Sequence, residues 1–188
     1  MKTRLLFILL SIIGFVSCEE SLQPKPKAYL ALNYEEASYK ELPLTFCPYT
    51  FEVNKNVILK DAKTKQACWV NLEYPSINGT IFITYKPITD NLKELIIDGQ
   101  KLPLEHTVKA DEIEGDLYVN DENKTYGMLY EVKGNAASQA QFYVTDSIKH
   151  FLTGSIYFDA KPNFDSILPA AAYLKNDMRH LIETIKWK

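Results

Sequence analysis

The chain has 188 residues, 46% of them hydrophobic, and a formal net charge of −3 at pH 7. Twelve Tyr and nine Phe provide ample apolar area for a buried core, which excludes a largely disordered chain. The mildly acidic, mixed charge argues against a nucleic-acid groove or a polybasic membrane patch, so no nucleic-acid partner is expected.

The first eighteen residues have the pattern of a bacterial lipoprotein signal. Lys2 and Arg4 form a positive start, and the apolar run 5–16 is long enough for secretion but too short to span a bilayer. The run ends in Phe-Val-Ser-Cys, which resembles a lipobox, although Phe15 stands where Leu is usual. The sequence therefore predicts a signal peptide over 1–17 and lipid attachment at Cys18. An ordinary secreted protein cut elsewhere and an uncleaved anchor are the alternatives.

The residues after Cys18 predict a tether and then one domain. Pro24 and Pro26 fix the backbone and remove donors, so 18–28 is expected to be an extended tether. The remainder of the chain, 29–188, has the length of one ordinary domain. Outside the cytoplasm the two remaining cysteines, Cys47 and Cys68, are expected to form a disulfide; two buried reduced thiols are the alternative.

Alternating apolar residues predict a first β-hairpin. The stretches 68–74 and 80–85 alternate, and Pro-Ser-Ile-Asn-Gly between them suits a turn that needs positive φ. Residues 29–48 predict an irregular lead-in, and 50–53 are expected to pair beside the hairpin. The spacing of Leu92, Leu95, Ile96, Gly99 and Leu102 then predicts a helix that is capped by Thr89 or Asp90 and ended or kinked by Pro103. An acidic stretch, 105–124, is expected to be a surface connection.

Three further strands and a long helix complete the expected fold. An antiparallel meander is predicted over 126–132, 139–145 and 151–158. Its core-facing residues are expected to be Met128, Tyr130, Val132, Ala140, Phe142, Val144, Leu152, Gly154, Ile156 and Phe158. The apolar stripe from Ile167 to Ile185 predicts a helix that begins at Asp165 and runs to Trp187. We therefore expect an α+β fold in which five to six antiparallel strands pack against this helix and one shorter helix.

Candidate chemistry is sparse in this sequence. His106, Asp111 and Glu112 could line an acidic metal site, but a solvated loop is the expected reading. The side chains of Asp116, Asn120, Asp121, Glu122 and Asn123 lack the spacing and the Gly of a calcium loop. His150 falls in a predicted turn and His180 on the polar side of the last helix. No nucleophile, phosphate-loop or zinc motif occurs, so no enzyme, cofactor or metal is expected.

Two features suit a partner surface. The turn Gly134, Asn135, Ala136, Ala137, Ser138 and Gln139 is small and amide-bearing, so a partner's backbone could approach it closely; a plain tight turn is the alternative. Tyr143, Thr145 and Tyr157 lie opposite the expected core. They indicate either a second helix-covered layer or an exposed docking surface.

Long stretches of the sequence resemble the gliding-motility lipoprotein GldD family. The resemblance is carried by Cys18 with the stretch 24–30, by 68–75 and 84–87, by 126–139, and by 142–147, 153–155, 165–169 and 187–188. The ending in strands and then a long helix is also similar to the Mog1/PsbP fold, which is an analogy of fold and carries no function.

The resemblance implies a lipoprotein of the cell envelope that gliding requires, with palmitate among its expected lipids. It implies partners among other gliding and type IX secretion envelope proteins, and a membrane contact through the lipid anchor. The domain is expected in the periplasm, and Glu19 after Cys18 favours the outer membrane over the inner one. An envelope enzyme acting on glycan or protein, with its chemistry in the acidic stretch 105–124, is the alternative.

Overall fold

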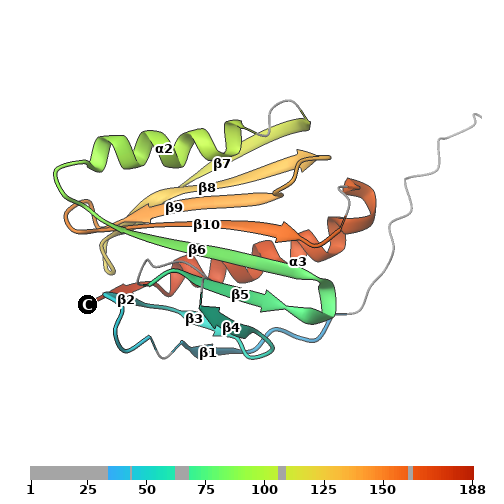
Figure 1. The fold of residues 1–188 in the computed structure, drawn as a ribbon, viewed down its shortest axis with the longest axis horizontal. Helices are drawn as coiled ribbons and strands as arrows, with labels where there is room; N and C mark the ends of the chain where they lie inside the picture. Colours follow the sequence, from blue (N-terminus) through green and yellow to red (C-terminus); the bar gives the residue numbers. More distant parts are fainter. Residues whose placement is uncertain (1–33, 43, 62–67, 106–108, 161–162) are drawn as a thin grey trace, which may run out of the picture.

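A computed structural model of the chain describes residues 34–42, 44–61, 68–105, 109–160 and 163–188 (Figure 1). The tether, the signal segment with Cys18, and His106 lie outside the described residues. The elements in chain order are β1 (Tyr39–Glu41), β2 (Tyr49–Thr50), β3 (Glu52–Asn54), β4 (Ile58–Asp61), β5 (Val70–Tyr74), the 3-10 turn η1 (Pro75–Ile77), β6 (Gly79–Pro87), α2 (Leu92–Leu104), β7 (Ala110–Asn120), β8 (Thr125–Gly134), β9 (Ala140–Thr145), β10 (His150–Phe158), α3 (Phe164–Glu183) and β11 (Lys186–Trp187).

A seven-stranded antiparallel sheet forms the centre of the fold. Its order is β4-β5-β6-β10-β9-β8-β7, so the predicted hairpin and the predicted meander meet where β6 pairs with β10. The α+β class is confirmed, with seven strands in this sheet instead of five or six. The place beside the hairpin is taken by β4, whereas 50–53 was expected there; β2 and β3 pair with β11 and β1 instead.

The β5–β6 hairpin forms where the sequence predicted it. Val70 pairs with Ile83 and Leu72 with Ile81, and all four side chains are buried on one face. Asn78 adopts a left-handed conformation with φ of 48°, which a short polar side chain tolerates, and its N–H donates to the Pro75 carbonyl. The turn signal in Pro-Ser-Ile-Asn-Gly therefore describes the local backbone correctly.

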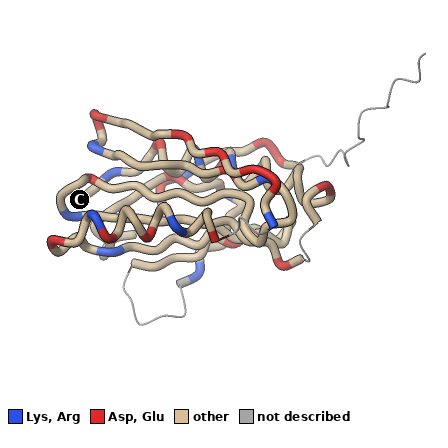
Figure 2. Tube along the Cα trace, turned by 90° about the horizontal axis from the view of Figure 1, so that it is seen from above, with Lys and Arg blue, Asp and Glu red and all other residues tan. Residues whose placement is uncertain are grey.

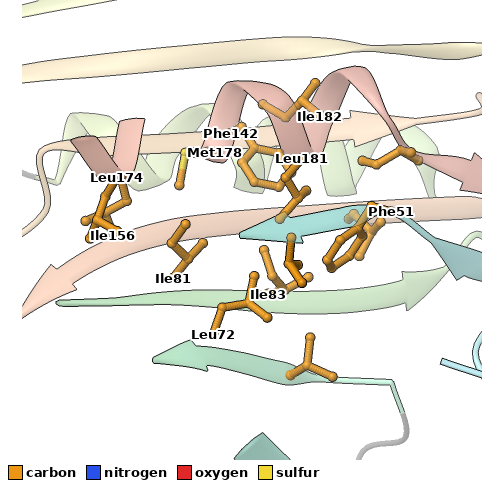
Figure 3. Close-up of a cluster of buried hydrophobic side chains, with 14 of the residues drawn as sticks. Phe51, Leu72, Ile81, Ile83, Phe142, Ile156, Leu174, Met178, Leu181 and Ile182 are labelled. Atoms are coloured by element: carbon orange, nitrogen blue, oxygen red, sulfur yellow. The ribbon is translucent and has the colours of Figure 1, made fainter. Parts of the chain in front are cut away.

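Helix α3 covers one face of the sheet and supplies much of the main core. Leu174, Met178 and Leu181 lie near Ile81, Phe142 and Ile156 in Figure 3, and Ile182 and Ile83 belong to the same cluster. Each buried side chain of this kind contributes about 1.5–3 kcal/mol. The helix ends at Glu183, four residues before the predicted end. Trp187 belongs to β11, which pairs with β2.

Helix α2 covers the opposite face. Leu95 packs with Tyr143 and Phe151, whereas the adjacent residues Phe142 and Leu152 lie in the core under α3. Neighbouring residues of a strand point to opposite faces, so the sheet lies between the two helices. The α2 helix includes Pro103 and continues one residue further, to Leu104.

The expected orientation of β8 is wrong for two residues. Met128 pairs with Tyr143 and Tyr130 with Gln141, and both pack in the cluster under α2. It is Leu129, paired with Phe142, that enters the core under α3. Both faces of β8 carry apolar residues because both faces of this part of the sheet are covered, so alternation could not distinguish the two sides.

The acidic stretch 105–124 is not a surface connection. Ten residue pairs join β7 to β8, from Ala110 and Gly134 to Asn120 and Thr125, with a bulge after Ala110. Its side chains are mostly exposed because β7 forms an edge of the sheet. The high polarity of this stretch thus obscured strand β7 in the sequence. In the part of the chain that the structure describes, β7 pairs with β8 only.

The segment before the central sheet is tied to the rest of the fold at several points. Cys47 and Cys68 form a disulfide, with Cα atoms 5.4 Å apart, that joins the lead-in to the start of the hairpin. The Tyr49 hydroxyl donates to the Cys68 carbonyl over 2.6 Å. Strand β1 pairs with β3, and the Lys188 N–H donates to the Pro48 carbonyl over 2.8 Å.

Charge is spread over the molecule. Figure 2 shows acidic and basic residues scattered over the molecule among uncharged ones. Ion pairs at the surface include Lys60 with Glu73 and Lys175 with Glu131. Among the helices that the structure describes, none is long and apolar enough to cross a membrane.

Candidate functional site

A groove of about 750 Å³ lies beside the first half of α3. Ser166, Ile167, Ala170 and Tyr173 of α3 form one wall. The other walls come from the β5–β6 turn, from the end of β10, and from the first described residues, Tyr34 and Glu35. The groove is therefore built by segments far apart in the sequence.

The β5–β6 turn and the end of β10 give the groove an apolar side. Pro75 and Ile77 come from the turn, and Phe158 ends β10. The Asp159 N–H donates to the Asn78 carbonyl over 2.9 Å, which fixes the turn against the end of β10. This wall offers apolar contact area next to the exposed polar residues Ser76 and Asn78, a combination typical of ligand sites.

The opposite side of the groove is held by the beginning of the described chain. The rings of Tyr34 and Tyr173 lie 5.0 Å apart, and the Tyr173 hydroxyl donates to the Glu35 carbonyl over 3.2 Å. The Asn56 amide donates to the Glu35 carboxylate over 2.7 Å. The first described residues thus lie along the rim of the groove.

Behind Tyr173 a buried carboxylate organises a polar network. Asp177 is 4% exposed, and it accepts hydrogen bonds from the Tyr39 hydroxyl at 2.8 Å and the Asn54 amide at 3.0 Å. The same Asn54 amide donates to the Tyr173 hydroxyl at 2.8 Å. A carboxylate removed from water needs such donors, so the network fixes the lead-in and β3 against α3.

The tyrosines of this network are held in their protonated form. Burial, and then the neighbouring Asp177 carboxylate, raise the pKa values of Tyr39 and Tyr74 above the usual range. Burial also raises the pKa of Tyr173. At neutral pH these hydroxyls therefore donate hydrogen bonds, and the network serves as a scaffold for the groove wall.

The acidic residues singled out in the sequence do not line this groove. Asp111 and Glu112 lie on β7, where the Glu112 carboxylate is 2.9 Å from the Lys133 ammonium. The side-chain oxygen of Asn120 accepts a hydrogen bond from the Asn123 N–H in the tight β7–β8 turn. Within the described residues, no group of three His, Cys, Asp or Glu side chains is placed to hold a metal ion.

The turn from Gly134 to Gln139 is largely buried. Gly134 has φ of 103°, and Ala136, Ser138 and Gln139 are at most 4% exposed. The Asn135 side chain accepts a hydrogen bond from the Phe164 N–H at 2.9 Å, so the turn caps α3. The surface that this turn offers to a partner is limited to Asn135 and Ala137.

The two described histidines take part in local contacts. His150 is the first residue of β10; its Nδ1 is 3.0 Å from the Tyr85 hydroxyl, and its ring stacks on Trp187 at 5.4 Å. His180 stacks on Tyr39 at 3.5 Å, and its Nε2 is 2.8 Å from the Glu52 carboxylate. The His150 ring thus contacts the C-terminal strand β11, and the His180 ring links α3 to β1 and β3.

The face opposite the main core combines both alternatives that the sequence left open. Tyr143 is 6% exposed beneath α2, and Thr145 is buried, with its hydroxyl donating to the His150 carbonyl. Tyr157 lies beyond the cover of α2, 39% exposed, with its ring edge-on to Phe82.

Sequence reasoning missed Tyr34, Tyr173 and Asp177. A signal for Asp177 did exist, because it lies three residues after Leu174 and directly before Met178, on the buried stripe of α3. A carboxylate on such a stripe requires donors from other elements. Nothing in the sequence identified these donors as Tyr39 and Asn54.

Comparison with known proteins assigns a family and a fold. The model of the family described as gliding motility lipoprotein GldD matches residues 19–187. No curated protein matches this chain.

Two solved structures are similar to this one. The Ran-binding protein Mog1p of Saccharomyces cerevisiae is 10% identical, with 81% of this chain and 96% of that chain covered and a TM-score of 0.53. Cyanobacterial PsbP (CyanoP) from Synechocystis sp. PCC 6803 is 13% identical, with coverages of 85% and 98% and a TM-score of 0.48. The likeness to Mog1p confirms the expected fold alone, since fold does not carry function.

Proposed function

The chain belongs to the gliding motility lipoprotein GldD family, and from this premise we propose that it acts in gliding as a non-catalytic contact protein. In this proposal its partners are other envelope proteins of the gliding and type IX secretion machinery. A signal peptide directs export, Cys18 carries the lipid, with palmitate among its acyl chains, and the domain lies in the periplasm at the outer membrane.

The groove beside α3 is the observation that supports a contact role. It combines apolar side chains such as Ile77, Phe158 and Ile167 with neutral donors and acceptors such as Ser76 and Asn78. Protein and peptide ligands bind to surfaces of this composition by burying apolar groups inside a polar rim. The groove is partly open to solvent, so we expect that a segment of a larger partner can lie in it.

The position of the groove also suits a tethered protein. Tyr34 lines the groove, and about sixteen residues separate it from Cys18. At full extension this stretch reaches about 50 Å. A lipid at Cys18 would therefore keep the groove within that distance of the membrane surface, where other envelope proteins project.

Site-specific crosslinking in gliding cells tests this proposal. A photoreactive amino acid at Ser76, which is exposed on the groove, should crosslink to a gliding or secretion protein of the envelope. The matched control is the same amino acid at Ile148, which is 70% exposed in the β9–β10 turn, away from the groove. No crosslink at Ser76, or the same product from both positions, would contradict the proposal.

A second measurement addresses catalysis. We expect Asp121→Asn to leave gliding unchanged, because this exposed carboxylate lies in the β7–β8 turn and serves no reaction in the proposal. The matched control is Glu122→Gln, an exposed carboxylate in the same turn. Loss of gliding in the Asp121→Asn variant alone, with the protein folded and lipidated, would favour an envelope enzyme.

A further inference from the structure

Strand β7 presents a long free edge. It has eleven residues and, in the described part of the chain, pairs only with β8. Figure 1 shows it at the border of the sheet opposite β4, which has four residues. The backbone N–H and C=O groups on the outer side of such an edge can pair with another extended chain.

One face of this edge carries exposed apolar side chains. Leu117 is 75% exposed and Val119 is 55% exposed. Leu117 pairs with Met128 of β8, and Val119 pairs with Tyr126 of β8. Met128 belongs to the cluster under α2. The apolar surface of the edge therefore continues from the core of the molecule to its rim.

The other face of the edge is acidic. Glu112, Glu114 and Asp116 alternate with Ile113, Gly115 and Leu117 and so lie on this face, and the strand has no Lys or Arg. Lys133 lies 2.9 Å from Glu112 and 3.0 Å from Glu114, and Arg179 lies 3.4 Å from Asp116. Two cations thus face three carboxylates of the strand, and an excess of negative charge remains on this face.

This charge pattern selects among possible occupants of the edge. A second copy pairing antiparallel through β7 would bring carboxylates opposite carboxylates, and like charges in facing positions destabilise a strand pair. A strand with basic residues on the same face would instead find complementary charge. Its apolar residues, on the other face, would lie against Leu117 and Val119.

We propose that β7 is a docking edge for an extended segment of another protein that alternates basic and apolar residues. The segment adds an eighth strand to the sheet beyond β7. The backbone groups of the edge provide affinity, while the acidic face and Leu117 select the sequence. This surface is separate from the groove, so the two proposals can fail independently.

Peptide binding to the mature lipoprotein in nonionic detergent tests this inference. The probe is a peptide of about ten residues that alternates Lys and Val, the length of β7. The comparison peptide alternates Glu and Val. We expect the Lys-Val peptide to bind at least tenfold more tightly, and hydrogen exchange of β7 amides to slow when it binds.

Two protein variants make the test specific. Leu117→Lys should weaken binding of the Lys-Val peptide at least tenfold, because it removes apolar contact and adds a like charge at the edge. Ile148→Lys, at a residue of similar exposure outside β7, should leave binding unchanged.

Several outcomes would overturn the inference. Equal binding of both peptides would contradict selection by charge. Binding without slower hydrogen exchange of the β7 amides would contradict the addition of a strand at β7. Absence of binding would mean that the acidic residues only protect the edge from aggregation. A dimer in sedimentation that Leu117→Lys dissociates would assign the edge to a second copy. None of these results affects the crosslink expected at Ser76.

Discussion

Asp177 shows how one buried charge determines its surroundings. Its carboxylate lies among Leu174, Met178 and Leu181 on α3, where desolvation would be costly without donors. Tyr39 and Asn54 supply those donors from the lead-in and from β3. The residue therefore ties the segment that lines the groove to the helix that forms its wall.

Asp177→Ala should lower the free energy of unfolding by about 1–3 kcal/mol, because the Tyr39 hydroxyl and the Asn54 amide lose their acceptor. Chemical denaturation measures the change. The control is Glu183→Ala, an exposed carboxylate of the same helix, for which we expect a change within about 0.5 kcal/mol. Equal losses in the two variants would show that the network contributes nothing.

His150 makes stability depend on pH. Burial lowers its pKa, and this effect outweighs the attraction of Asp146. An unfolded histidine takes up its proton near pH 6.5, whereas the folded one does so at lower pH. The unfolded state then binds more protons in this range, so protonation of His150 favours unfolding as the pH falls.

We therefore expect the free energy of unfolding to decrease as the pH falls from about 7 through the folded pKa of His150. The variant His150→Gln should show a flatter dependence over this range, whatever its absolute stability. Denaturation curves at a series of pH values measure both slopes. Identical slopes in the two proteins would contradict the assignment.

Helix α3 depends on a cap from a distant turn. Its N-cap residue, Asn163, makes no side-chain hydrogen bond to the helix. The Phe164 N–H instead donates to the side chain of Asn135, which follows β8. The turn that the sequence suggested as a partner contact thus joins the meander to the helix.

Asn135→Ala should cost about 1 kcal/mol of stability, the usual effect of losing a helix cap. Asn163→Ala is the matched control and should cost less, because its side chain makes no cap hydrogen bond. Thermal unfolding of the two variants measures the difference. A larger loss of stability in Asn163→Ala than in Asn135→Ala would contradict the assignment of the cap to Asn135.

At the scale of the whole molecule, we expect anchoring and folding to be separate. The buried hydrophobic residues that the structure describes run from Leu42 to Ile185. We predict that the lipid at Cys18 places the domain at a membrane and that folding of the domain does not depend on it.

Cys18→Ser should leave the free energy of unfolding unchanged and release the protein from the membrane fraction, with loss of gliding. Fractionation, denaturation and motility assays measure the three effects. Ser21→Ala, in the tether, is the control and should behave like the wild type. A Cys18→Ser protein that stays with membranes and supports gliding would show that lipidation is not what function needs.

How far the sequence predicted the fold depended on the range of the interactions. The β5–β6 hairpin, the strands of the meander and both helices follow from local periodicity and turn residues, and the structure confirms each of them. Strand β7 was missed because its many carboxylates, and Gly115 in the middle of its apolar face, obscured the alternation of Ile113, Leu117 and Val119. The groove was missed because its lining residues, such as Tyr34, Ile77 and Ile167, lie far apart in the sequence and share no motif.

The sequence by itself determined the elements, the family resemblance and the pairing expected for Cys47 and Cys68, since these depend on neighbouring residues, motifs and residue types. Tertiary structure alone decided that β6 joins β10, that both faces of the sheet are covered, and that Glu35 meets Tyr173 of α3. The reason is physical. Contacts between distant segments form only when their gain in burial and hydrogen bonding exceeds the entropy of bringing them together, and no local pattern encodes that balance.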